Sequence, residues 1–175
     1  FGQWVGEFNG DGKADIASVH SDGTVYMKLS NHQGAVASGF DSATWGGATT
    51  WGNINFTQTG DFNGDGLTDF ASRQGGSVFM KLATGTTFVA ETWSASGTWG
   101  AAEFTWASDF NGDGLTDFGT RVNNSVHMKL STGFGFSADT WNTTGTWPEG
   151  KYIGLGDFNG DGSLDIGATR VGTTI

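Results

Sequence analysis

The stretch Asp61-Phe62-Asn63-Gly64-Asp65-Gly66-Leu67-Thr68-Asp69 decides how this sequence folds. Oxygen-bearing side chains stand at its first, third, fifth and ninth positions, and glycines stand at its fourth and sixth. Glycine permits the positive φ of a tight turn, and the alternation places the oxygens on one side of that turn. The pattern therefore predicts a compact acidic loop suited to a hard cation.

Four near-identical copies of this stretch, counted with the residue before each, occur along the chain. The copies begin at Gly6, Gly60, Ser108 and Gly156, which are 54, 48 and 48 residues apart. Two other landmarks keep this phase, namely the Met-Lys-Leu triplets that begin at Met27, Met80 and Met128 and the tryptophan pairs Trp45/Trp51, Trp93/Trp99 and Trp141/Trp147. We expect residues 1–175 to form one region with repeats at 6–59, 60–107 and 108–155 and a partial repeat at 156–175.

Each repeat reads as four short strands. In the third repeat they are expected at 104–107, 117–121, 125–130 and 135–141, with alternating apolar and polar residues in 125–130. Glycine makes up 31 of 175 residues, which argues against a helical protein. Four strands every 40 to 50 residues are typical of a β-propeller blade, and a stacked solenoid is the alternative. The predicted fold is all-β, a propeller with about three and a half four-stranded blades.

The four acidic loops carry most of the negative charge. The net charge is −10, and twelve of the eighteen acidic residues lie in these loops. An acidic chain does not favour nucleic acid or an anionic membrane, and no apolar run approaches the roughly 18 residues of a membrane span. Cysteine is absent, so neither a disulfide scaffold nor a thiolate zinc site is available.

Calcium is the expected occupant of the loops. Carboxylates, an amide and a main-chain carbonyl give the oxygen ligands that calcium takes, whereas magnesium needs a stricter octahedron. A plain hairpin with solvated acids is the alternative, but three like charges in nine residues repel one another without a cation. Glu7 replaces aspartate in the first copy and makes that loop the weakest candidate. The side-chain candidates are Glu7, Asn9, Asp11 and Asp15; Asp61, Asn63, Asp65 and Asp69; Asp109, Asn111, Asp113 and Asp117; and Asp157, Asn159, Asp161 and Asp165.

A loop of the form F-N-G-D-G-x-x-D within a blade-sized repeat resembles the FG-GAP/VCBS repeats of integrin-α-like propellers. The resemblance implies that the carbonyl of the seventh loop residue also binds calcium, which adds Lys13, Leu67, Leu115 and Ser163. The wider text GDFNGDGLTDF, SVHMKLSTG and ADTW is similar to the Psathyrella velutina-type fungal lectins. That likeness implies a seven-bladed, calcium-containing propeller that binds N-acetylglucosamine, of which this chain would supply about half.

A recurring set of aromatic and polar residues supports sugar binding independently of that likeness. Sugar rings stack on tryptophan, and planar polar groups fix their hydroxyls. The alternative is that the tryptophans pack between blades. The candidates are Arg73, Trp93, Trp99, Arg121, His127, Trp141 and Trp147.

We therefore predict a non-enzymatic, calcium-stabilised lectin for N-acetylglucosamine-type glycans with repeated sites between blades. His20, His32 and His127 are not equivalent in the repeat, and no Gly-x-Ser-x-Gly segment is present. The alternatives are an integrin-α-like protein-binding propeller and the accessory module of a secreted enzyme. We expect an extracellular or cell-surface-facing location, with a cytosolic fungal lectin as the alternative.

Three and a half blades are too few to close a ring, because propellers need about four to eight. The sequence opens at Phe1 with neither an initiator methionine nor a visible signal peptide. We therefore expect a mature or truncated product whose ring is completed by another chain or by the rest of its parent.

Overall fold

A computed structural model describes residues 2–20, 22–31, 39–46, 57–74, 77–94, 105–122, 125–142 and 152–169. Within those residues the secondary structure consists of strands and tight turns. None of these residues belongs to a helix long and apolar enough to cross a membrane.

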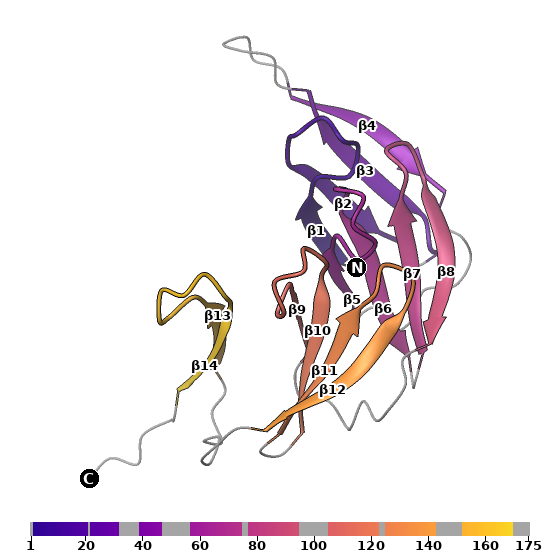
Figure 1. The fold of residues 1–175 in the computed structure, drawn as a ribbon. Coiled ribbons are helices and arrows are strands. Elements are labelled where there is room, and N and C mark those ends of the chain that lie inside the picture. Colours follow the sequence, from indigo (N-terminus) through magenta and orange to yellow (C-terminus); the bar gives the residue numbers. More distant parts are fainter. Residues whose placement is uncertain are drawn as a thin grey trace.

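The strands form three four-stranded antiparallel sheets and one strand pair, each in sequential order (Figure 1). The first sheet contains β1 (Gly2–Gly6), β2 (Asp15–Val19), β3 (Val25–Ser30) and β4 (Phe40–Trp45). The second contains β5 (Thr57–Gly60), β6 (Asp69–Gln74), β7 (Ser77–Ala83) and β8 (Phe88–Ser94). The third contains β9 (Thr105–Ser108), β10 (Asp117–Val122), β11 (Ser125–Ser131) and β12 (Phe136–Asn142), and the pair is β13 (Tyr152–Gly156) with β14 (Asp165–Thr169).

The sheets are blades of a β-propeller. Their first strands are the innermost ones, because β1 contacts β5 and β5 contacts β9. The described residues thus hold three complete blades and the first two strands of a fourth, as the repeat predicted. Most of the strand ends expected for the third repeat lie one residue from the ends of β9 to β12, and the others coincide with them.

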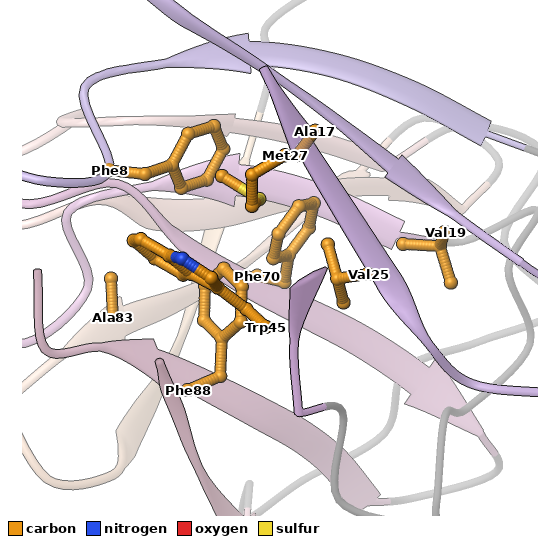
Figure 2. Packing of buried hydrophobic residues seen from close by; sticks show 9 residues of the cluster. All are labelled: Phe8, Ala17, Val19, Val25, Met27, Trp45, Phe70, Ala83 and Phe88. Carbon is orange, nitrogen blue, oxygen red and sulfur yellow. The ribbon is translucent and has the colours of Figure 1, made fainter. Parts of the chain in front are cut away.

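Each blade has two faces with different partners. We call the face turned to the next blade the forward face and the face turned to the preceding blade the rear face. In the first junction, Met27 and Trp45 on the forward face of the first blade join Phe70 and Phe88 on the rear face of the second (Figure 2). Because side chains alternate along a strand, every second residue faces the same junction.

Aromatic pairs repeat at both complete junctions. Trp45 lies 5.0 Å from Phe88 between ring centroids, and Trp93 lies 5.3 Å from Phe136. A second pair stacks loop against strand, with Phe62 5.1 Å from Phe118 at an interplanar angle of 24°. These rings carry much of the apolar contact between blades.

Candidate metal and ligand sites

The four acidic loops join the first strand of each blade to the second. The glycines at their fourth and sixth positions all have positive φ, for example 81° at Gly64 and 85° at Gly66. These are the values that the sequence pattern required, since a side chain at such a φ is strained. All four loops therefore adopt the predicted tight turn.

Backbone amides hold the first three oxygen-bearing side chains of the second loop in place. The Asp61 carboxylate accepts hydrogen bonds from the amides of Gly64 at 2.7 Å and Gly66 at 2.8 Å. Asn63 Oδ1 accepts from the Asp65 amide at 3.1 Å, and Asp65 Oδ1 accepts from the Leu67 amide at 2.9 Å. The same bonds occur in the third and fourth loops. The loop backbone thus orients its own oxygen donors.

The ninth residue ties the loop to its blade. Asp69 is fully buried; its Oδ2 accepts from the Phe62 amide at 3.2 Å and its Oδ1 from the Ala83 amide at 2.8 Å, at the end of β7. Asp15 and Asp117 make the equivalent pairs of bonds. A carboxylate has about four acceptor positions, so these bonds leave acceptor capacity on both oxygens.

Burial and like charges act together on this carboxyl group. The pKa of Asp69 is raised to about 7, chiefly by burial and in addition by the charges of Asp65 and Asp61, although its two backbone hydrogen bonds act in the opposite direction. Burial also raises the pKa of Asp15 and Asp117. A cation in the loop would counteract the effect of both burial and repulsion on the pKa, because its positive charge favours the ionised carboxylate.

The donor set of the second and third loops fits a hard cation. Both loops read DFNGDGLTD, and each offers three carboxylates, one amide oxygen and a main-chain carbonyl. In the part of the chain that the structure describes, no three histidine or carboxylate side chains alone form a metal-binding group. A cation here would therefore also need the amide and carbonyl oxygens, and ligands of that chemistry suit calcium.

The first loop differs in two ways. Glu7 Oε1 accepts from the amides of Asn9 and Gly10, while Glu7 Oε2 is buried and finds no hydrogen-bond partner within the described ranges. Lys13 Nζ lies 2.8 Å from Asp11 Oδ2, and this bond lowers the pKa of Asp11. Lys13 already neutralises one negative charge of this loop, so the charge repulsion that a cation would relieve is smallest here.

The sugar candidates Arg73 and Arg121 lie on forward faces, each in a cross-strand row that also contains a tryptophan. Arg73 pairs with Val78, which pairs with Trp93, and Arg121 begins the equivalent row that ends at Trp141. Trp93 is only 3% exposed and packs against the next blade, so its burial agrees with the blade-packing alternative.

Trp141 is 36% exposed, and its Nε1 donates to Asp139 Oδ2 at 3.0 Å. Its ring therefore remains partly accessible to solvent. The two remaining candidates, Trp99 and Trp147, lie outside the described residues.

His127 lies on the rear face of the third blade, opposite the forward face that carries Arg73. Its register partner Thr120 is 1% exposed, and among the described residues Thr120 Oγ1 has no hydrogen-bond partner. His127 Nδ1 lies 3.3 Å from Thr140 Oγ1. Thr120 was not among the sequence candidates; only its alignment with Ser18 and Ser72 in the repeat could have indicated it.

These residues define what we call the polar junction, formed by Arg73, Thr120, His127 and Thr140 between the second and third blades. The preceding junction has Val19 and Phe79 where the polar junction has Arg73 and His127. The junctions are therefore chemically unequal although the blades share one fold.

Comparisons with known proteins agree with this architecture. Residues 8–72 and 61–120 match the model of the FG-GAP-like repeat family. The structure is similar to that of a lectin from Agrocybe aegerita, whose description concerns specific recognition of non-reducing terminal N-acetylglucosamine. The TM-score is 0.71 at 20% identity, and the match covers 94% of this chain and 45% of the lectin chain, so this chain spans less than half of that lectin's length. No curated protein sequence matches this chain.

Proposed function

The chain belongs to the FG-GAP-like repeat family, and we propose that its propeller is a calcium-stabilised lectin that binds glycans ending in N-acetylglucosamine between blades. The observation that carries this proposal is the polar junction. There the Thr120 hydroxyl is buried between two blades and has no partner in the described part of the chain, on the junction that Arg73 and His127 also face.

A sugar suits this junction chemically. A buried hydroxyl without a hydrogen bond costs about 1 to 3 kcal/mol, and a ligand hydroxyl or acetamido group recovers that cost. Arginine offers several donors in a fixed fork, and histidine can donate or accept. The similarity to the Agrocybe lectin supports a sugar as ligand, and membership of the Psathyrella velutina-type lectins is proposed from the resemblance in sequence alone.

We assign no catalytic role to this site. The aspartates at the first position of the second, third and fourth acidic loops accept hydrogen bonds from loop amides, and the polar junction contains no carboxylate among its named members. A lectin of this type would work outside the cell or facing the cell surface, where such glycans are displayed.

The Thr120→Val variant separates sugar binding from folding. Valine has nearly the same shape, and no partner is lost, so we expect stability to be unchanged or slightly higher. Affinity for soluble N-acetylglucosamine should fall about fivefold to tenfold, because one hydrogen bond to the ligand is lost. Isothermal titration calorimetry measures the affinity, and thermal unfolding measures the stability.

Ser72→Ala is the matched control, because Ser72 occupies the equivalent position in the preceding junction. It should leave sugar affinity unchanged. Absence of any heat with N-acetylglucosamine at tens of millimolar would rule out the lectin proposal, and heat that Thr120→Val does not reduce would move the site elsewhere.

Calcium in this proposal stabilises the propeller and does not touch the sugar. It would be held by the side chains at the first, third, fifth and ninth loop positions together with the carbonyl of the seventh. Its chemistry is to supply positive charge among crowded carboxylates. This chain's own residues provide the oxygen donors and, through the loop amides, keep them oriented.

We further propose that another chain, or the rest of a longer parent, completes the ring. Phe40 on the first blade is 49% exposed and Phe158 in the fourth acidic loop is 66% exposed, whereas their repeat equivalents Phe88 and Phe62 are buried between blades. Exposed apolar faces of this kind favour association. Light scattering of the 175-residue chain should give a mass above 18.3 kDa. A stable, well-behaved particle of one chain's mass would contradict this.

A further inference from the structure

The second blade holds the acidic loop of the first blade by its backbone. The Thr68 amide donates to the Glu7 carbonyl at 2.6 Å, and the Glu7 amide donates to Thr68 Oγ1 at 3.0 Å. At the next junction the Thr116 amide donates to the Asp61 carbonyl at 2.7 Å. The eighth residue of one loop thus bonds the first residue of the preceding loop.

Glycine just before the loop makes this approach possible. A Cβ added at Gly6 would lie 2.5 Å from Thr68 Cγ2, and one added at Gly60 would lie 2.5 Å from Thr116 Cγ2. Real side chains do not come this close, so the threonine requires a glycine opposite it. We call the glycine, the threonine and their backbone bond the clamp.

Other contacts reinforce the clamp on the second loop. Ser131 Oγ in the third blade donates to the Phe62 carbonyl at 2.7 Å. The Leu115 side chain lies against Gly64, where an added Cβ would be 2.9 Å from its Cδ2. The third blade therefore holds the second loop at its beginning and at its turn.

The third junction lacks the clamp. Ser108 replaces the glycine, Leu164 replaces the threonine, and in the described residues no backbone bond joins Leu164 to Asp109. The second and third loops have identical sequences from their first to their ninth residues. Any difference in their cation affinity must then come from their neighbours.

We propose that Thr68 and Thr116 are positioning residues that preorganise the acidic loop of the preceding blade, so that cation binding by that loop is coupled to docking of the next blade. This inference rests on the proposed calcium binding. The clamped second loop binds calcium more tightly than the third loop of the same sequence, because less backbone freedom is lost on binding. By reciprocity, calcium in the second loop strengthens docking of the third blade by the same factor.

Transplanting the clamp tests this inference without damaging the fold. The double variant Ser108→Gly with Leu164→Thr gives the third junction the glycine and the threonine of the clamp. Hydrogen exchange of the whole chain is followed by mass spectrometry as calcium is added, using peptides that cover residues 61–69 and 109–117. In the unaltered chain, the second loop should be protected at about threefold to tenfold lower calcium than the third. In the double variant, the midpoint of the third loop should fall towards that of the second, which itself stays unchanged; the Ser131 and Leu115 contacts are not transferred, so the two midpoints need not become equal.

The single variant Ser108→Gly is the control for added glycine, and it should shift the third loop less than the double variant does. Equal midpoints in the unaltered chain, or a third loop that the double variant does not shift, would overturn the clamp and leave calcium binding intact. If calcium protects neither loop of the unaltered chain, the proposed calcium binding fails and the inference fails with it.

Discussion

Removal of calcium by a chelator is expected to lower the melting temperature of this protein strongly. A ligand that binds only the folded state stabilises it by about 2.7 kcal/mol per site at a hundredfold excess over Kd. For a chain of this size that corresponds to roughly 5 to 10 °C per occupied loop. Loops that bind independently add their effects, so two occupied loops should double the shift.

Asp113→Ala should remove only the calcium stabilisation that the third loop contributes. The variant deletes the carboxylate at the fifth loop position. Oδ1 of this carboxylate also accepts a hydrogen bond from the Leu115 amide. Asp41→Ala is the charge-matched control, because Asp41 is an exposed acid of β4 outside the acidic loops. Thermal unfolding with and without calcium measures both. A melting curve that excess chelator does not change would contradict calcium stabilisation altogether.

Phe62→Ala is expected to destabilise the fold by about 3 to 5 kcal/mol, with or without calcium. The Phe62 ring is fully buried, stacks on Phe118 and meets Phe136 edge to face at 6.2 Å. Its removal leaves a cavity at the junction between the second and third blades. Chemical denaturation measures the loss.

Phe134→Ala is the control for this change. Phe134 is 81% exposed, so its removal should alter the free energy of unfolding by less than about 0.5 kcal/mol. If both variants lose the same stability, the blade junctions do not carry the packing energy that we assign to them.

The local structure of this protein could be predicted well from its sequence. The glycines of the acidic loops have the positive φ that their spacing required, and the expected strand at 125–130 is β11 (Ser125–Ser131). These features depend on residues that are near one another in the chain. A repeat of about fifty residues was enough to identify the blade, because each repeat is one meander of four strands.

Burial of equivalent residues could not be predicted in this way. Lys28, Lys81 and Lys129 occupy the same place in the Met-Lys-Leu triplet, yet Lys81 and Lys129 are each 2% exposed while Lys28 is exposed. Lys81 and Lys129 lie on rear faces that a preceding blade covers, and burial lowers their pKa. The sequence of the triplet is the same in all three, so the neighbouring blade alone makes the difference.

The features of the candidate site can be separated in the same way. The repeat and the four-stranded blade follow from the periodicity of the chain, and the turn and oxygen donors of each acidic loop follow from torsions over nine residues. The burial of Trp93, the lack of a partner for the Thr120 hydroxyl among the described residues and the bond from Thr116 to Asp61 follow only from how the blades pack. Each of these depends on two blades meeting face to face, and the residues that meet are about one repeat apart in the chain.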